Sequence, residues 1–287
     1  MENDILSLIV ASSHKFSKGQ RNIAKYILEN YDKAAFMTAS KLGNTVNVSE
    51  STVVRFAASL GFEGYPEMRK SLQDMIRHCL TSVQRIEVAR ELMENNDILS
   101  AVLNSDIDMI RMTLESTKRD DFDRAVDALI SAKQIYIFGL RSSSALANFM
   151  GFYFNLIFDN IRVVNDSSAS EVFEQILRIK DGDVLVALSF PRYSRRTIKA
   201  MKYTRAAGAK IIGITDTPAS PIAMNADIPL YAKSDMISFL DSLVAPLSLV
   251  NALIVATSAK AEVDLSMNFE KLESIWAEYE VYEQLDT

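Results

Sequence analysis

The sequence predicts two domains of different class: an all-helical domain, followed by a three-layer α/β domain with a mostly parallel sheet. Three observations lead to this prediction. Up to about residue 80 the apolar residues recur at helical spacing. After residue 134, short apolar runs alternate with longer helical stretches, which is typical of parallel strands covered by helices on both faces. The length of 287 residues is sufficient for two domains.

The first strongly predicted helix covers residues 17–30. Ser17 and Gln20 have the spacing of a capping box, in which each satisfies a free amide of the other. Its buried stripe is expected to consist of Ile23, Ala24, Ile27 and Leu28. A later helix is expected around Pro66, because proline fits the first turn of a helix.

Between these two helices, residues 38–65 predict a pair of short helices joined by a tight polar turn. Thr38 can cap the first helix, and Gly43 and Asn44 tolerate the left-handed backbone with which many helices end. Ser49 is expected to cap the second helix, with its side-chain oxygen accepting from a backbone amide.

The second of these helices is amphipathic. Its expected apolar stripe is Val53, Val54, Phe56, Ala57 and Leu60. In a helix-turn-helix the start of the second helix meets base edges in the major groove, and small hydroxyl residues with one arginine suit that position. The expected DNA contacts are therefore Ser49, Ser51, Thr52, Arg55 and, from the basic stretch before it, Lys18. A helical hairpin with a merely polar outer face is the alternative.

The second half of the chain predicts alternating strands and helices. Strands are expected at 134–139, 161–164, 183–188, 210–214 and 227–231. Helices are expected at 143–158, 169–179, 194–207, 237–260 and 268–285, and the fourth of them is expected to be interrupted or bent near Pro246.

An amphipathic helix is also expected at 97–117, before the first strand. Its inward residues are predicted to be Ile98, Val102, Ile107, Ile110 and Leu114. The predicted boundaries are a helix-turn-helix domain at 1–80, a helical linker at 81–105 and an α/β domain at 106–287.

Two expected strand ends are rich in hydroxyl and cationic side chains. In an open α/β sheet, ligands bind beyond the carboxyl ends of the strands, where helix N-termini offer amides to an anion. The candidate ligand-binding residues are Arg141, Ser142 and Ser143 in the first loop, and Ser189, Arg192 and Ser194 in the second. Serines at such positions also serve simply as helix caps. The two loops together, with Arg195 and Arg196 nearby, favour an anionic ligand.

Composition limits the location and the chemistry. The net charge is −6, but residues 14–26 carry only basic charges, so a basic face on an acidic chain is expected. The one cysteine, Cys79, excludes an internal disulfide and is typical of a reducing compartment. Neither a signal peptide nor a membrane span is apparent, so we expect a cytoplasmic protein. No metal or other cofactor is expected, because no clustered ligand spacing is present.

Three stretches resemble RpiR-type bacterial transcription regulators: VSESTVVRFAASLGFEGYPEM, IYIFGLRSSSALA and the long run that begins VLVALSFPRYSRRTIKAMKYTRAAGAK. The resemblance covers essentially the whole chain. It implies a helix-turn-helix that binds a double-stranded DNA operator, joined to a flavodoxin-like sugar isomerase (SIS) domain that senses a phosphosugar or another anionic sugar. It also implies that Ser143 and Ser189 contact the phosphate.

The loops depart from the pattern of that family. Many SIS domains have Ser-x-Ser-Gly-x-Thr where this chain has residues 189–194, so Pro191 replaces a serine and Arg192 replaces a glycine. Arg141 likewise stands where a second glycine is common. The added guanidinium groups suit a carboxylate or an acidic sugar phosphate.

The alternative function is that of a SIS-type sugar-phosphate isomerase, which needs an acid or base near a carbonyl. Both histidines, His14 and His78, precede the α/β domain, and Glu171, Glu174 and Lys233 remain as acid–base candidates. A purely structural dimerisation protein would not explain the strand-end loops. We therefore predict a regulator without catalytic residues. It is expected to form a homodimer or homotetramer through the segment Phe149 to Phe158 and the terminal helix that carries Trp276.

Overall fold

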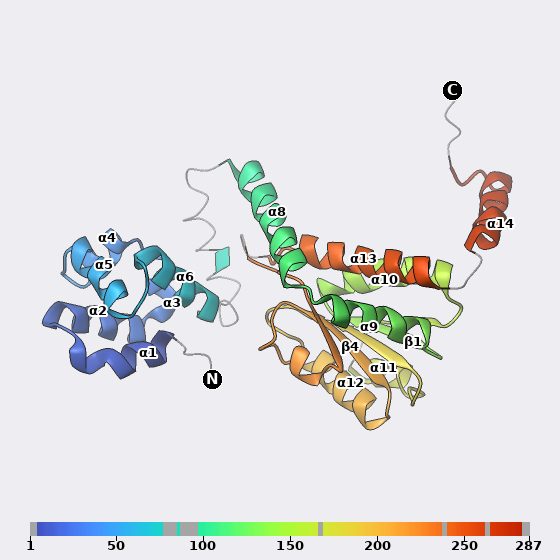
Figure 1. Cartoon of the computed structure of the whole chain (residues 1–287), viewed down its shortest axis with the longest axis horizontal. Helices are drawn as coiled ribbons and strands as arrows, with labels where there is room; N and C mark the ends of the chain where they lie inside the picture. The colour runs from blue at the N-terminus through green and yellow to red at the C-terminus, as the bar shows by residue number, and fades with distance from the viewer. Residues whose placement is uncertain are drawn as a thin grey trace. The chain divides into compact units, whose positions relative to one another are not determined.

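The computed structural model describes residues 5–76, 85–86, 97–165, 169–236, 240–261 and 265–282 (Figure 1). The chain divides into two compact units, one formed by Met1–Ile98 with Met236–Leu240, the other by Leu99–Asp235 with Asp241–Thr287. The predicted domain boundaries at residues 80 and 105 stay predictions, because most of 77–96 lies outside the described residues.

The described part of the first unit is helical throughout. Its helices are α1 (Ile5–Ser12), α2 (Lys18–Glu29), α3 (Tyr31–Ala34), α4 (Ala39–Thr45), α5 (Glu50–Ser59) and α6 (Tyr65–Ile76), with a short 3-10 turn, η1 (Ser13–Lys15). The apolar faces of these helices enclose one core. Phe56 of α5 is fully buried in that core and packs against Phe16, with 5.0 Å between ring centroids. The all-helical prediction is confirmed, although α1 had no clear signal in the sequence.

Both predicted caps before the hairpin are present. The Ser17 side chain accepts from the Gln20 amide, and the Gln20 side chain accepts from the Ser17 amide at 2.9 Å, which completes the capping box. Thr38 Oγ1 accepts from the Lys41 amide at 3.1 Å and caps α4. These bonds satisfy amides that a helix start would otherwise leave free.

The turn between α4 and α5 differs from the prediction. Asn47, with φ of 56°, adopts the left-handed conformation, whereas Gly43 and Asn44 lie inside α4. Gly43 serves another purpose, because a Cβ at this position would be 2.8 Å from the Val48 carbonyl oxygen. Glycine therefore lets α4 pack tightly against the turn.

The second unit is built on a five-stranded parallel sheet. The strands are β1 (Ile135–Gly139), β2 (Ile161–Val164), β3 (Val184–Leu188), β4 (Lys210–Thr215) and β5 (Ile228–Tyr231), in the order β2-β1-β3-β4-β5. In register, Gly139 of β1 pairs with Leu188 of β3, which pairs with Ile214 of β4. The carboxyl ends of these three neighbouring strands are therefore level.

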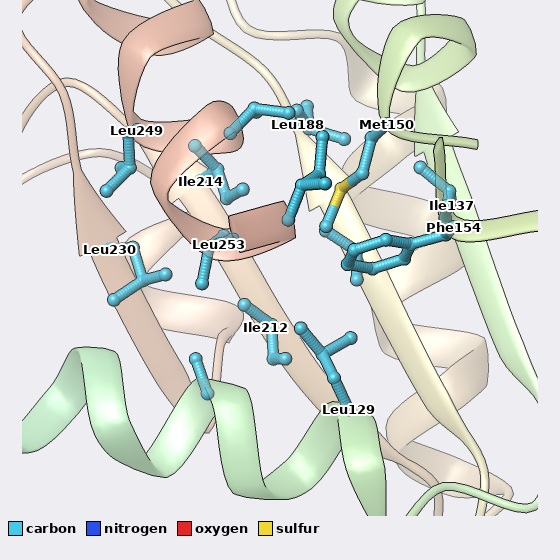
Figure 2. Packing of buried hydrophobic residues seen from close by; sticks show 14 of the residues in the cluster. Leu129, Ile137, Met150, Phe154, Leu188, Ile212, Ile214, Leu230, Leu249 and Leu253 are labelled. Atoms are coloured by element: carbon cyan, nitrogen blue, oxygen red, sulfur yellow. The ribbon is translucent and has the colours of Figure 1, made fainter. Parts of the chain in front are cut away.

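Helices cover both faces of the sheet, which confirms the three-layer prediction (Figure 1). One layer holds α9 (Arg119–Ile130), α10 (Ser143–Ile157) and α13 (Val244–Lys260), and the other holds α11 (Ala169–Gln175) and α12 (Arg195–Ala206). Figure 2 shows the first interface, where Phe154 of α10, Leu253 of α13 and Leu129 of α9 pack against the strands. The strands read as continuous apolar runs because both of their faces are buried.

Several helix boundaries differ from the prediction. The helix expected at 237–260 begins at Val244, so the predicted interruption near Pro246 is the start of the helix. Pro246 lies in its first turn, where a missing amide costs no internal hydrogen bond. The helix expected at 169–179 ends at Gln175. The terminal helix α14 runs from Leu265 to Glu278, and α9 was not predicted at all.

The inward face predicted for the helix at 97–117 is wrong. In α8 (Ile98–Ser116) the buried residues are Met109 and Thr113, whereas Ile107 and Leu114 are exposed. Of the other predicted inward residues, Ile98 and Ile110 are also exposed and Val102 is half-buried. The reason is that Thr113 Oγ1 accepts from the Lys233 amide at 2.9 Å, which fixes the rotation of the helix.

We predict that Gly43→Ala destabilises the first unit by about 1–3 kcal/mol, because the new methyl group would overlap the Val48 carbonyl oxygen. Hydrogen exchange of the α4 and α5 amides in the full chain would report the loss. The control is Gly64→Ala, whose Cβ would be no closer than 3.5 Å to Pro66 Cδ. Equal protection in both variants would show that the turn yields to the methyl group.

Candidate functional site

The first candidate site is the exposed surface at the start of α5. Ser49, Ser51 and Arg55 are exposed and Thr52 is half-buried. A Cβ on Gly19 would lie 3.3 Å from Val48 and 3.4 Å from Thr52, so the start of α2 packs against the start of α5. The exposed Lys18, next to Gly19, thus joins the predicted DNA contacts at one place on the surface.

Ser49 does not cap α5 as predicted. Its Oγ lies 2.9 Å from Ser51 Oγ and 2.9 Å from Thr52 Oγ1, and no backbone amide donates to it. The three hydroxyls instead form a hydrogen-bonded cluster at the positive end of the helix, where they can donate to or accept from a nucleic acid. Val54, predicted as part of the apolar stripe, is 42% exposed.

The second candidate site lies where β1 and β3 end. The strand order reverses between these two strands, and open α/β sheets bind ligands at such a point. Ser143 opens α10 after β1, and Ser189 follows β3 directly, so the level strand ends bring both loops to one edge. A Cβ at Gly139 would collide with the Ser143 carbonyl oxygen, so glycine allows α10 to begin close to the strand.

Two arginines hold unusual backbone conformations at this edge. Arg141 has φ of 56° and Arg192 has φ of 67°, and both are exposed. The left-handed region costs a side-chain-bearing residue roughly 1–2 kcal/mol, whereas glycine adopts it freely. Both arginines thus keep the backbone of a glycine while adding a guanidinium group. Strained residues cluster at functional sites, so these two point to a ligand-binding role.

Positive charge accumulates at the start of α12. Arg195 and Arg196 open this helix, three and four residues after Arg192, and the first turn, described in full, holds no acidic residue. The helix N-terminus is itself the positive end of the dipole, so cations there are unfavourable until an anion binds. Such an arrangement favours the binding of an anion.

The serines of the two loops have different roles. Ser189 and Ser143 are both 5% exposed, and Ser189 Oγ accepts from the Ser194 amide at 3.3 Å. Ser194 caps α12, because its Oγ accepts from the amides of Arg196 and Thr197, so the cap interpretation holds for this serine. Ser142 is exposed and makes no side-chain cap, which leaves its hydroxyl at the open edge.

A cavity of about 260 Å³ opens beside the first loop, at the carboxyl ends of β1 and β2. Arg141 and Ser144 line it, and Ser144 Oγ donates to the Arg141 carbonyl oxygen at 2.6 Å. The remaining lining residues are Gly139, Leu140, Ala147, Asn148, Val163, Val164 and Asn165. Its lining is mainly polar, which suits a hydrophilic rather than an apolar ligand.

Sequence reasoning missed a hydrogen-bonded pair that fixes the second loop. Tyr193 Oη donates to Asp216 Oδ1 at 2.8 Å, and Thr215 Oγ1 donates to the same oxygen at 3.2 Å. Burial, together with the Asp216 carboxylate, raises the pKa of the Tyr193 phenol. The phenol therefore stays a neutral donor that ties the loop to the end of β4. Asp216 follows a strand, so the rule that selected the other loops could have found it.

The acid–base candidates lie on separate elements of the second unit. Glu171 and Glu174 lie on α11, and Lys233 follows β5. Within the described ranges, no three His, Cys, Asp or Glu side chains are placed to hold a metal ion. No helix in the part of the chain that the structure describes has the length and apolar character needed to cross a membrane. His78 and Cys79 fall outside the described residues.

Each of the two units contains a stretch that matches a known protein-domain family. The model of the helix-turn-helix domain of the rpiR family matches residues 3–78, and that of the SIS domain matches residues 128–256. Similar curated proteins include the HTH-type transcriptional regulator HexR of Pseudomonas aeruginosa, 27% identical over 94% of each chain. HexR of Escherichia coli is 25% identical over 98% of this chain and 97% of its own.

A similar solved structure is that of the Vibrio vulnificus NanR protein complexed with ManNAc-6P. It is 20% identical, covers 96% of this chain and 98% of its own, and superposes with a TM-score of 0.58. At this identity the likeness shows a shared fold.

We predict that Arg192→Gly stabilises the second unit by about 0.5–1 kcal/mol, because glycine relieves the left-handed strain and loses part of that gain to its greater freedom when unfolded. Urea unfolding of the full chain measures this. Lys199→Gly, in the regular part of α12, is the matched control and should destabilise by about 1 kcal/mol. Losses of equal size in both variants would contradict the assigned strain.

Proposed function

Because this chain is an RpiR-type transcription regulator in both of its domains, with DNA binding as the task of the first, we propose that its SIS domain senses an anionic sugar, with phosphosugars as the leading class. The observation that carries the proposal is the meeting of two serine- and arginine-bearing loops at the switch point between β1 and β3. That the NanR protein of similar fold was solved with ManNAc-6P supports it.

In this proposal the phosphate is bound by Ser143 and Ser189 together with the amides at the starts of α10 and α12. Arg141 and Arg192 add guanidinium groups that pair with a carboxylate or a second anionic group of the sugar. Ser142 is exposed at the open edge, where its hydroxyl can add a ligand contact, whereas Ser194 holds the start of α12 beside the ligand.

For the DNA-binding half, we assign different tasks to Arg55 and Lys18. Arg55 lies one helical turn after Ser51 and Thr52 on the exposed side of α5, where it can reach a base edge. Lys18, at the start of α2, is placed to neutralise a phosphate. The hydroxyl cluster that begins with Ser49 supplies additional phosphate contacts.

The regulator is proposed to act in the cytoplasm as a homodimer or homotetramer, since helix-turn-helix proteins read two half-sites with paired units. Phe152 and Tyr153 of α10 are exposed by 63% and 40%, which supports this helix as one subunit contact, and α14 with Trp276 is another. A ligand changes DNA affinity only through its different affinities for the two arrangements of the DNA-binding units.

An isomerase function has less support. The residues from 106 onward contain no histidine, and the curated relatives are named as transcriptional regulators. We expect the pure protein to bind sugar phosphates without turning them over. Steady isomerisation that is lost in Glu171→Gln would contradict this.

Arg55→Ala should weaken binding to the operator by about 1–3 kcal/mol and relax sequence preference, because a base contact is lost. Fluorescence anisotropy at several salt concentrations, with DNA from upstream of the gene, measures this. Lys18→Ala serves as the contrast, because it should weaken binding to all DNA sequences alike. It should also reduce the slope of log affinity against log salt concentration by the amount expected for about one phosphate contact. Full affinity of a folded Arg55→Ala variant would remove this residue from the interface.

Ser189→Ala should weaken every sugar phosphate about tenfold, because an anchor shared by all ligands is lost. Arg192→Gly should instead weaken acidic-sugar ligands far more than neutral-sugar phosphates. Isothermal calorimetry separates the two effects, with Ser258→Ala as control, since Ser258 Oγ donates only to the Val255 carbonyl oxygen within α13. Equal losses for both ligand classes in Arg192→Gly would show that this arginine does not select the ligand.

A further inference from the structure

Helix α12 carries a row of basic side chains that extends beyond the proposed ligand site. The row, here named the α12 basic face, consists of Arg195, Lys199 and Lys202, which are all exposed. Successive members are four and three residues apart, so they lie along one side of the helix. The opposite side carries the buried Ala200 and Thr204 and packs on the sheet.

This face belongs to a stretch in which only basic charges occur. Residues 184–215 contain seven lysines and arginines and no aspartate or glutamate, although acids outnumber bases by 37 to 31 in the whole chain. Among the described residues, no acidic side chain forms an ion pair with Lys199 or Lys202. Acidic groups occur at the borders of the face. On one side Asp227 pairs with Arg205 at 3.3 Å, and on the other α11, which carries two glutamates, packs against α12.

Helix α9 of the same unit shows how a merely solvated helix face is built. Its first turn is acidic, as the positive end of the helix dipole favours, and Arg124 pairs with Asp121 at 2.8 Å. The first turn of α12 instead holds Arg195 and Arg196, and further cations follow them at helical spacing. Both features destabilise a helix until an anion neutralises them, so the charges of α12 point to an anionic partner.

The geometry and chemistry of the face favour an extended polyanion. Lys199 and Lys202 lie about 6 Å and 10 Å along the helix axis beyond Arg195, so a ligand bound at the start of α12 does not account for them. A partner with several negative charges in a line does. No large hydrophobic side chain is exposed on α12, and lysine is depleted in protein interfaces, so nucleic acid fits this face better than an acidic protein does.

We propose that the α12 basic face is a second DNA-binding surface, which contacts phosphates and reads no base sequence. Helix α12 has 12 residues and is about 18 Å long, so it spans about five phosphates of one strand. The inference rests on DNA binding by the first unit, because DNA is then the polyanion that the chain already meets. It is independent of the anionic-sugar site, and it requires no particular placement of the two units, since phosphates line a duplex along its whole length.

Fluorescence anisotropy of the full chain on a long duplex, without sugar ligand and at several salt concentrations, tests the proposal. The double variant Lys199→Gln, Lys202→Gln should bind operator and unrelated sequences alike about tenfold more weakly, and the slope of log affinity against log salt concentration should fall by about 1.8. The matched control Lys118→Gln, Lys271→Gln removes the same charge from exposed positions elsewhere in the second unit and should bind like the unchanged protein. Equal losses in the two double variants, or no loss in either, would overturn the proposal.

Poly-glutamate distinguishes DNA from an acidic protein as the partner. If the face serves an acidic protein, Lys199→Gln, Lys202→Gln loses poly-glutamate binding while its DNA binding stays unchanged, and the proposal is wrong. Arg55→Ala in the same DNA assay reports operator recognition by the first unit separately. A failure of the recognition helix is therefore not mistaken for a failure of the α12 basic face.

Directed cleavage of the DNA gives a second readout that removes no charge from the face. Ala206 is exposed one helical turn after Lys202, on the same side of α12 as the basic row. In a Cys79→Ser background, Ala206→Cys that carries an iron chelate should cleave the bound DNA backbone. Ser274→Cys, labelled in the same way at an exposed position of α14, should not. Cleavage from residue 206 that is no stronger than cleavage from residue 274 would contradict the proposal.

Discussion

The parallel register of β1, β3 and β4 is the constraint on which the proposed ligand site depends. Because Gly139, Leu188 and Ile214 pair across the sheet, the loops that follow these strands start at the same level. The reversal of strand order between β1 and β3 then sends α10 and α12 to opposite faces of the sheet. Two helix N-termini consequently meet at one edge, and their amides and dipoles favour an anion there before any side chain is considered.

Tight packing supports this geometry. Glycine at 139 lets α10 begin against the end of β1, and the Tyr193–Asp216 hydrogen bond connects the loop after β3 to the end of β4. The same principle operates in the other unit, where Gly43 allows α4 to contact the turn before α5. In both units a residue without a side chain sets the distance between a helix and its neighbour, so the exposed polar groups are positioned by the buried backbone behind them.

The sequence predicted the five strands and most helices because continuous apolar runs and helical periodicity are strong local signals. It failed where a distant contact decides the outcome. The buried face of α8 is the one on which Thr113 Oγ1 accepts a hydrogen bond from the Lys233 amide. The spacing of apolar residues in the sequence carries no information about that hydrogen bond. The left-handed residue of the turn is Asn47, whereas Gly43 lies inside α4 and packs against the Val48 carbonyl oxygen. Ser49 Oγ is hydrogen-bonded to neighbouring hydroxyls rather than to an amide. The site loops were predictable by position, whereas the partners of their side chains were not.

In the proposed site, the left-handed arginines make ligand preference separable from folding. At residues 141 and 192 the backbone already has the shape that glycine adopts freely, so an exchange between arginine and glycine asks for no change of backbone conformation there. If the proposed site is correct, a single substitution in a gene copy can therefore change which anionic sugar is recognised while Ser143, Ser189 and the DNA-binding unit stay as they are. Such positions would allow a duplicated regulator to acquire a new effector without passing through a variant that fails to fold.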